Sequence, residues 1–567
     1  MLILAPPPPA DETVTSHARA QLDRFAKTKI EPLPEPSATF QLRVAGIGLA
    51  CLFLAVAGQL TRLAVKADGM VQVSAAVVDP VARSYSRPDI VDANGRLLAT
   101  DVEVHSLYAD PSRIADRDEA IEKLSAVLPD LDEAELRKAL SDRNRHFAWV
   151  RRGLTPKMAQ AVHDLGLPGF AFRRELRRAY PLGALAGHLL GRVDPDNKGV
   201  AGIERYIDDH VGIDGVLTSR PTERPPVRLS IEIGAQAGLE AELAEAMTRY
   251  KAAGAAAVIM DATTGEIAAS ASFPRTEPAR IADATDIVKK DRLQSGTYEL
   301  GSIFKMMTVA AALDSGSVTP ETMLDVRVPL QAGRYVIKDQ HSAGRPLSVT
   351  EIFLHSSNVG SGMLALDGGA TAQQAFLRRA GLLTPIATQA GPVTPPVTPA
   401  RWDRTETITI SYGHGIAVAP LQFAAAASAL INGGQSVAPS YIKRRPTDPA
   451  PAPTQVVSAQ TSAAMRTIMR RNVTDAHGTG KRADVPGYEV GGKTGTADIA
   501  GPRGYRQGGV ISSFLAAFPM SQPRYVMLVL LFEPQATAET GGKRLAGLTA
   551  APVASRIITR LGPLLER

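Results

Sequence analysis

A serine and a lysine three residues apart, Ser302 and Lys305, have the types and spacing for nucleophilic catalysis. Ser302 opens an apolar run, residues 304–313, so we expect it at a helix N-terminus, where free backbone N–H groups favour negative charge. Lys305 follows one turn later on the same face, and its amine can reach the Ser302 hydroxyl. A lysine accepts a proton only when neutral, which requires burial or a neighbouring cation. The pair predicts acyl transfer through a serine ester, although alone it also fits a helix-capping serine followed by a solvated lysine.

A second polar group, Ser356 and Asn358, interrupts the apolar segment 351–360. The Ser356 hydroxyl can relay a proton between Lys305 and a leaving group. The Asn358 amide offers both a donor and an acceptor to an extended peptide substrate. By itself this stretch is equally well explained as an ordinary turn.

A third group, Lys493, Thr494, Gly495 and Thr496, is predicted to begin a strand. Lys493 and the two threonine hydroxyls form a cationic edge suited to a terminal carboxylate. Gly495 lets a substrate backbone approach closely, and the Thr496 N–H can share an oxyanion hole with the N–H of Ser302. Lys493 is also the candidate cation that lowers the pKa of Lys305. Without the other two groups, a glycine-marked edge strand with a solvated lysine would be an adequate explanation.

The order S-x-x-K, S-x-N, K-T-G resembles the three active-site elements of penicillin-binding proteins and serine β-lactamases. Residues 87–99 (RPDIVDANGRLLA) resemble the R-G-x-I-x-D-R-N-G-x-x-L-A stretch of class B penicillin-binding proteins, with Pro88 and Ala93 as departures. The chain is most similar to the septal, FtsI-type peptidoglycan transpeptidases of Gram-negative bacteria. Further resemblance lies in residues 178–181, 187–191, 199–204 and 410–422.

This resemblance implies a D,D-transpeptidase that crosslinks peptidoglycan stem peptides and is acylated by β-lactams. Ser302 would be the nucleophile and Lys305 its base. Septal synthesis is the expected setting, with an elongation-type enzyme as the alternative. A hydrolytic β-lactamase, a soluble carboxypeptidase and a non-catalytic β-lactam sensor also remain open. The implied catalytic residues are Ser302, Lys305, Ser356, Asn358 and Lys493, and the implied substrate-binding residues are Thr494, Gly495 and Thr496.

Residues 41–65 are predicted to form a single transmembrane helix, because Val44 to Gly58 are continuously apolar or small. About 22 helical residues rise roughly 33 Å, enough to cross the hydrocarbon core of a bilayer. Cations are denser before this segment than after it, so the positive-inside rule places the tail 1–40 in the cytoplasm and the catalytic part in the periplasm. We expect an uncleaved anchor in the inner membrane. The flanking cations are Arg24, Lys27, Lys29 and Arg43 on one side and Lys66 on the other.

The composition excludes several classes of protein. The only cysteine, Cys51, lies inside the predicted span, so no disulfide or Cys-based metal site is possible within one chain. The ten histidines show no tight ligand spacing, and neither a metal nor a cofactor is expected. His414 is the histidine to examine, since the family places its Gly-rich segment near the active-site rim. The net charge of +6 is modest for 567 residues, and no basic, aromatic-interleaved patch indicates nucleic acid.

The chain divides into four predicted pieces. A Pro-rich tail, residues 1–40, precedes the membrane helix, residues 41–65. Residues 66–227 resemble a non-catalytic, dimerisation-type pedestal, and residues 228–567 form the transpeptidase domain. Within this domain, residues 255–261 and 266–270 are predicted to form a strand hairpin around the turn 262–265. Late strands are predicted at residues 512–518 and 525–532, and a closing helix at residues 548–561. Strands at both ends of the domain, with helices between, predict an antiparallel sheet flanked by helices, as in serine β-lactamases. The fold class is therefore a membrane-anchored α+β or α/β protein. No glycosyltransferase domain is evident, so a separate membrane glycosyltransferase and other cell-division proteins are the expected partners.

Overall fold

The computed structural model describes residues 86–211, 225–275, 277–278, 290–445, 447, 452–501 and 504–566, with Phe53, Leu54 and Ala57. These three isolated residues are helical, and Phe53 and Leu54 are exposed. The predicted tail 1–40 and the rest of the predicted membrane segment 41–65 lie outside the described residues. Among the residues that are described, no helix is both long enough and apolar enough to cross a membrane.

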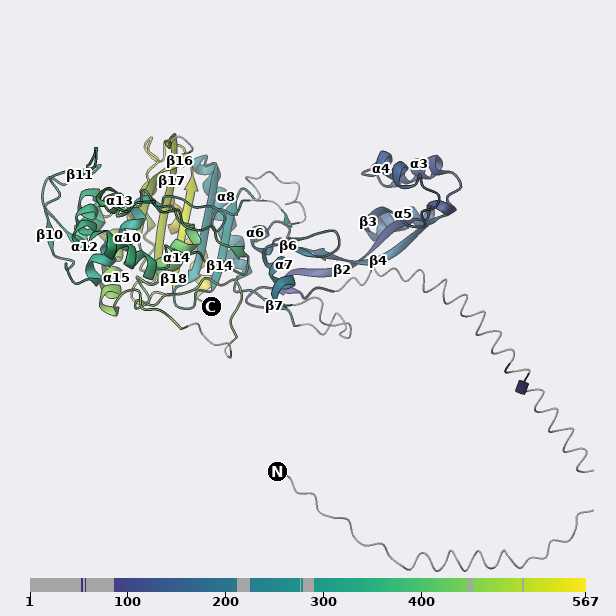
Figure 1. Cartoon of the computed structure of the whole chain (residues 1–567), viewed down its shortest axis with the longest axis horizontal. Helices are drawn as coiled ribbons and strands as arrows, with labels where there is room; N and C mark the ends of the chain where they lie inside the picture. Colours follow the sequence, from purple (N-terminus) through teal and green to yellow (C-terminus); the bar gives the residue numbers. More distant parts are fainter. Residues whose placement is uncertain are drawn as a thin grey trace, which may run out of the picture. The chain divides into compact units, whose positions relative to one another are not determined.

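A five-stranded antiparallel sheet, in the order β16-β17-β18-β8-β9, forms the centre of the C-terminal part (Figure 1). The predicted hairpin is confirmed as β8 and β9, and the two predicted late strands are confirmed as β17 and β18. Pairing of β18 with β8 joins the end of the domain to its beginning. The strands are β8 (Gly254–Asp261), β9 (Ile267–Phe273), β16 (Gly491–Gly501), β17 (Gly504–Phe518) and β18 (Tyr525–Phe532).

Both faces of this sheet are covered, which explains why every residue of β18 is apolar and buried. Alternate residues of β18 point to opposite faces, so Val526 and Leu528 join one core while Met527 and Val529 join the other. The Met527 face packs against α8 (Ile233–Tyr250) and α16 (Ala550–Leu565), the predicted closing helix. In Figure 1 the sheet lies between α8 and the helices α10 and α12.

The other face carries the helices that hold the polar motifs. The capping box of Ser348 and Glu351 begins α11, and Gly369, with a φ of 78°, kinks α12. The 3-10 turn η5 (Gly301–Phe304) precedes α10 (Lys305–Asp314). The other helices are α11 (Val349–His355), α12 (Asn358–Arg379), α13 (Arg404–Ile410), α14 (Pro420–Ser428) and α15 (Ala459–Thr474). Three short antiparallel strand pairs are formed by β10 (Met323–Leu324) with β13 (Leu347–Ser348), β11 (Leu330–Ala332) with β12 (Tyr335–Ile337), and β14 (Ala387–Thr388) with β15 (Gly391–Pro392).

The N-terminal described part, residues 86–211, is called the pedestal here. Its long strand β2 pairs with β3 and with β4, and apolar side chains of β2 and β3 pack against α3, α4 and α5. β1 pairs in parallel with β7, the strand that leads into the transpeptidase domain. The strands are β1 (Ile90–Val91), β2 (Leu97–Ala109), β3 (Ala148–Leu154), β4 (Phe170–Ala179), β5 (Arg192–Val193), β6 (Gly199–Ala201) and β7 (Val227–Arg228). The helices are α3 (Arg117–Val127), α4 (Glu133–Ala139), α5 (Pro156–Asp164), α6 (Gly187–Leu190) and α7 (Gly202–Tyr206).

A buried ionic network holds together the pedestal segments that resemble class B proteins. Glu204 is fully buried and accepts from Arg87 Nε at 2.9 Å and from Arg178 Nε at 2.7 Å. Arg178 also pairs with Asp101 at 3.1 Å. Burial opposes the charge on Arg178, but Glu204 and Asp101 outweigh it and raise the pKa of its guanidinium. Each buried cation therefore keeps its charge beside a carboxylate.

Candidate active site

Ser302 lies in the η5 turn, which runs directly into α10. Gly301 has a φ of 56°, which glycine adopts without strain, so the chain turns sharply just before the serine. Lys305 is fully buried, and its Nζ lies 2.9 Å from Ser302 Oγ. The α-helix begins at Lys305 and not at Ser302, but the expected contact between the two side chains is present.

The second motif lies at the break between α11 and α12. Ser356 ends α11 with φ 56° and ψ 42°, and Ser357 then caps α12 by accepting from the Gly360 N–H at 2.9 Å. This left-handed break turns both polar side chains of the motif toward Lys305. The Lys305 Nζ lies 2.6 Å from the Ser356 carbonyl oxygen, 3.0 Å from Ser356 Oγ and 2.7 Å from Asn358 Oδ1.

The third motif lies on β16, at the edge of the central sheet. Lys493 is fully buried, and its Nζ donates to Ser356 Oγ at 3.0 Å. The same ammonium group lies 5.6 Å from the centre of the Phe353 ring. The Ser356 hydroxyl therefore bridges the two lysines, and all three motifs meet at one point.

The two threonines of β16 have different partners. The Thr494 hydroxyl donates to Thr479 Oγ1 at 2.8 Å. The backbone N–H of Thr479 in turn donates to Asn472 Oδ1 at 3.1 Å. Thr496 Oγ1 instead accepts from the Ala546 N–H at 3.1 Å, which leaves its own hydrogen to donate. Both side chains line the cleft that contains Ser302.

Gly495 has a reason to be glycine that the sequence did not reveal. A Cβ at this position would lie 2.7 Å from the Leu300 carbonyl oxygen and 2.9 Å from Ile303 Cγ2. The strand therefore packs directly against the turn that carries Ser302, and only glycine allows this approach. Gly495, which the sequence predicts to lie beside a substrate backbone, thus also makes a close contact within the protein itself.

The surroundings of Lys305 favour its neutral form. Burial, reinforced by the charge on Lys493, holds the pKa of Lys305 well below the usual 10.5, while Asp339 acts in the opposite direction. Burial also lowers the pKa of Lys493, to about 7. A neutral Lys305 amine can donate its two hydrogens to the Ser356 carbonyl and Asn358 Oδ1, which only accept. Its lone pair is then available to a hydroxyl proton of Ser302 or Ser356.

Asp339 organises the second motif and was missed by the sequence analysis. One carboxylate oxygen accepts from the backbone N–H of Asn358 at 2.6 Å and of Val359 at 3.0 Å. The other accepts from the Ser357 hydroxyl at 2.6 Å. These three bonds fix the start of α12 and with it the Asn358 side chain. Asp339 belongs to no recognisable motif, so no sequence signal could have identified it.

The motifs open onto a cleft of about 500 Å³. His414, noted from the sequence, lies on its wall between the rings of Tyr412 and Tyr505, at centroid distances of 5.3 and 6.0 Å. Tyr505 donates to Glu299 at 2.9 Å, which ties the tip of β17 to the chain just before Ser302. Cations are also present at the rim, at Lys481, Arg482 and Lys543. In the described part of the chain, no group of His, Cys, Asp and Glu side chains is arranged to hold a metal ion.

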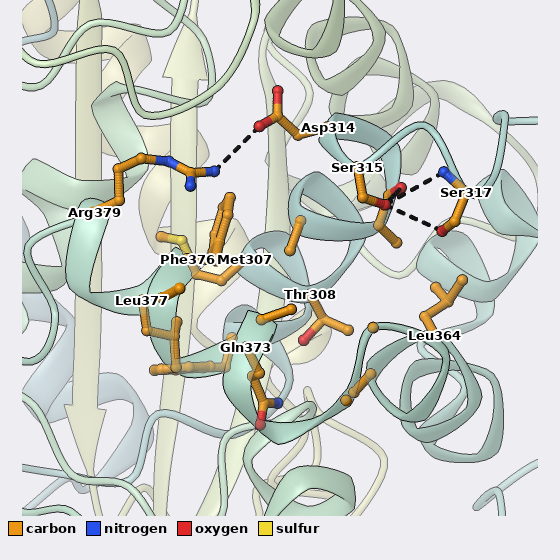
Figure 2. Close-up of a pocket in the computed structure, with 18 residues that line it drawn as sticks. Met307, Thr308, Asp314, Ser315, Ser317, Leu364, Gln373, Phe376, Leu377 and Arg379 are labelled. Atoms are coloured by element: carbon orange, nitrogen blue, oxygen red, sulfur yellow. Dashed lines mark hydrogen bonds and ion pairs between the residues drawn. The ribbon is translucent and has the colours of Figure 1, made fainter.

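A second cavity, of about 390 Å³, lies behind α10, between this helix and α12 (Figure 2). Its polar side chains are already satisfied, since Thr308 donates to the Ser411 carbonyl at 2.7 Å and Arg379 pairs with Asp314 at 3.2 Å. None of the described residues that line it is a lysine or a histidine, and Arg379 stays protonated, so a serine there has no side chain of these types to take its proton. The cleft with Ser302 is therefore the candidate active site.

Comparison with known families divides the chain in two. Residues 255–559 match the penicillin-binding protein transpeptidase domain, and residues 83–216 match the penicillin-binding protein dimerisation domain. The first match contains all eight residues that the sequence predicts to be catalytic or substrate-binding. The second match contains the buried network of Arg87, Arg178 and Glu204.

Individual relatives agree with this division. The probable peptidoglycan D,D-transpeptidase FtsI of Caulobacter vibrioides is 39% identical over 487 residues, which cover 85% of this chain and 81% of that protein. The peptidoglycan D,D-transpeptidase FtsI of Escherichia coli is 30% identical over 506 residues, covering 84% and 83%. A crystal structure of a putative peptidoglycan glycosyltransferase from Atopobium parvulum has the same fold, with a TM-score of 0.64 at 23% identity, covering 84% of this chain and 97% of that one.

Proposed function

The chain belongs to the class B penicillin-binding proteins of the FtsI type, and from this premise we propose that the Ser302 cleft carries out peptidoglycan D,D-transpeptidation during septal cell-wall synthesis. One observation carries the assignment of residues. Lys305, which is buried and has a pKa well below its usual value, lies 2.9 Å from the Ser302 hydroxyl and 3.0 Å from the Ser356 hydroxyl. A nucleophile, its base and a proton relay are thus in contact before any substrate binds.

Acylation follows from this arrangement. Neutral Lys305 takes the Ser302 proton as Ser302 Oγ attacks the carbonyl of the penultimate D-Ala in a stem peptide. The oxyanion that forms is held by the N–H groups of Ser302 and Thr496. The proton then passes from Lys305 through the Ser356 hydroxyl to the nitrogen of the terminal D-Ala, which leaves. The product is a serine ester of the shortened stem peptide.

In the second half of the reaction, transfer to the acceptor amine, the proton follows the same path in the reverse direction. The amine of a neighbouring stem peptide enters the position that the terminal D-Ala has left and attacks the ester carbonyl. Its proton returns through Ser356 and Lys305 to Ser302 Oγ, the ester bond breaks, and a peptide crosslink remains. Lys305 acts first as a base and then as an acid, and burial, which lowers its pKa, favours the neutral form that the first role requires.

Substrate recognition is assigned to the third motif and to Asn358. The free hydrogen of Thr496 and the positive end of Lys493 suit the terminal carboxylate that D-Ala-D-Ala and β-lactams share. Thr494 completes this edge, with its hydroxyl oriented by Thr479. The Asn358 amide, fixed by Asp339, can bind the peptide backbone of the donor.

The proposal extends to segments outside the described residues. We place a cytoplasmic tail at 1–40, a single inner-membrane helix at 41–65, a periplasmic pedestal at 66–227 and the transpeptidase domain at 228–567. The apolar run from Val44 to Gly58 and the cations before it support this topology. A separate membrane glycosyltransferase and other cell-division proteins are the proposed partners, because a transpeptidase needs newly polymerised strands as its substrate.

Covalent labelling tests the proposal directly. The full-length chain should retain fluorescent penicillin after denaturation, and Ser302→Ala should abolish the label without changing the melting temperature. Ser317→Ala, an exposed serine just beyond α10, is the matched control and should label normally. A label that persists in Ser302→Ala would overturn the assignment of the nucleophile.

Turnover then identifies the reaction. A peptide thioester that ends in D-Ala, offered with a D-amino acid as acceptor, should give the amide product. Thioester consumption without amide formation would indicate a hydrolytic carboxypeptidase. An acyl-enzyme with penicillin that disappears within seconds would indicate a β-lactamase.

A further inference from the structure

The pedestal contains a second cleft, of about 450 Å³, that the transpeptidase reaction does not use. It is lined by parts of β2, β3 and β4 and by the turn that follows β5. Five arginines line it but only two acids, Glu175 and Asp194. The five are Arg151, Arg152, Arg177, Arg178 and Arg192.

Three of these arginines are neutralised by specific acids. Arg178 is held by Glu204 and Asp101 in the buried network. Arg152 pairs with Glu175 at 2.8 Å and with Asp196 at 2.9 Å. Arg151 lies 3.7 Å from Asp130.

The other two, Arg177 and Arg192, form no ion pair with any acid among the described residues. Asp194, which also lines the cleft, instead accepts from the backbone N–H groups of Asp196 and Lys198, each at 2.9 Å. Arg192 is half-buried, so its charge is only partly solvated. A solvated sheet surface normally pairs its charges across strands, as Arg152 and Glu175 do, and these two arginines depart from that pattern.

Arg177 is also held in place. Gly153 has a φ of 70°, and a Cβ on it would collide with the Arg177 guanidinium. The side chain therefore lies across β3 along the cleft, where the strand offers no side chain. Arg177 is exposed, and its guanidinium lies against the backbone of Gly153.

The cleft is not purely ionic. Val104, Leu176 and Val193 line it together with the two unpaired guanidinium groups. A phosphate ion would fill only a small part of such a volume and would leave the apolar side chains in water. Carboxylates that alternate with apolar side chains would satisfy both kinds of surface.

We propose that this cleft binds an acidic peptide segment of a partner protein, with Arg177 and Arg192 each receiving a carboxylate. The segment lies over Val104, Leu176 and Val193 with its apolar side chains. The site is separate from the Ser302 cleft and shares none of its lining residues.

Fluorescence anisotropy with the full-length chain tests the proposal. The probe is a short fluorescein-labelled peptide that repeats Glu-Glu-Leu, and the uncharged control peptide repeats Gln-Gln-Leu. At about 50 mM salt the acidic peptide should bind, with an affinity that falls as salt is raised, and the control peptide should not. The double substitution Arg177→Gln with Arg192→Gln should weaken binding by at least about tenfold.

Arg174→Gln is the matched control, because Arg174 lies on the same strand but does not line the cleft and pairs with Glu103. It should change the affinity by less than about twofold. Melting temperatures of all variants check the fold. Binding that is absent in the wild type, or unaffected by the double substitution, would overturn the proposal. Displacement of the peptide by inorganic pyrophosphate at equal concentration would also overturn it, in favour of a small oxyanion ligand.

Discussion

The transpeptidase domain and the pedestal each bury two cationic side chains, in opposite surroundings. In the pedestal, Arg87 and Arg178 share the carboxylate of Glu204, at 2.9 and 2.7 Å. In the cleft, Lys305 and Lys493 share only the hydroxyl of Ser356, at 3.0 Å from each. Among the described residues no carboxylate forms an ion pair with either lysine.

Buried charge therefore has a structural role in the pedestal and a chemical role beside Ser302. A buried cation beside a carboxylate keeps its proton, because removing one partner would leave the other uncompensated. A buried cation beside neutral oxygens and a second cation loses its proton readily. The residue types match these uses, since an arginine cannot give up its proton in a protein and a lysine can.

The sharpest test of the comparison is Lys305→Arg, which makes the cleft resemble the pedestal. The arginine stays protonated and cannot accept the Ser302 proton, so the acylation rate constant with fluorescent penicillin should fall by roughly 10³- to 10⁴-fold. Lys481→Arg, at the rim of the same cleft, is the control and should acylate at nearly the wild-type rate. A Lys305→Arg protein that acylates normally would show that the proton goes elsewhere.

The reverse test removes the shared carboxylate from the pedestal. Glu204→Gln keeps the shape but leaves Arg87 and Arg178 short of negative charge, and should lower the free energy of unfolding of the pedestal by about 3–5 kcal/mol. The measurement is the shift of the denaturant transition. Glu103→Gln, in an exposed pair with Arg174, should cost less than about 1 kcal/mol. Equal losses for the two variants would mean that the buried network has no special role.

A third test examines how Lys493 acts on Lys305. Only neutral Lys305 accepts a proton, so acylation should rise with pH through the pKa of Lys305. The charge on Lys493 lowers that pKa. In Lys493→Gln the pKa should rise, and the acid side of the pH–rate profile should move up by about one pH unit, or about 1.4 kcal/mol. A shift toward lower pH would contradict the proposed coupling of the two lysines.

The smallest expected effect is a shift of the pH–rate profile toward lower pH, opposite to the shift expected for Lys493→Gln. Asp339 raises the pKa of Lys305, although its oxygens are already occupied by three hydrogen bonds. Asp339→Asn can keep the two backbone bonds while losing the charge, so the acid side of the profile should move down by about 0.3–0.5 pH unit. Asp325→Asn, an exposed acid paired with Arg327, is the control and should leave the midpoint unchanged.

Local spacing predicted part of the site. The three-residue interval between Ser302 and Lys305 corresponds to one helical turn, so their contact followed from geometry alone. The hairpin of β8 and β9 followed from two strand-like segments on either side of a glycine-containing turn. That Ser356 and Lys493 would join this pair came only from resemblance to a family, because no rule of sequence spacing brings together residues 137 positions apart.

The remaining features depend on tertiary contacts that leave no local signature. Asp339 acts through backbone N–H groups 19 and 20 positions away, which any sequence would provide. Glu204 lies in a segment recognised by resemblance, but its sharing by Arg87 and Arg178 emerged only from the fold. The predicted membrane helix lies outside the described residues and stays a prediction.

The close packing at Gly495 limits which substitutions the enzyme can tolerate. Since any side chain there would push β16 away from the turn before Ser302, a substitution would separate the N–H groups of Ser302 and Thr496, which we propose to hold the oxyanion together. Natural substrate and β-lactam would lose that geometry equally, so selection by a drug would gain nothing at this position. We expect heritable loss of drug sensitivity to arise instead around the rim of the cleft, at residues such as Tyr412, His414 and Lys543.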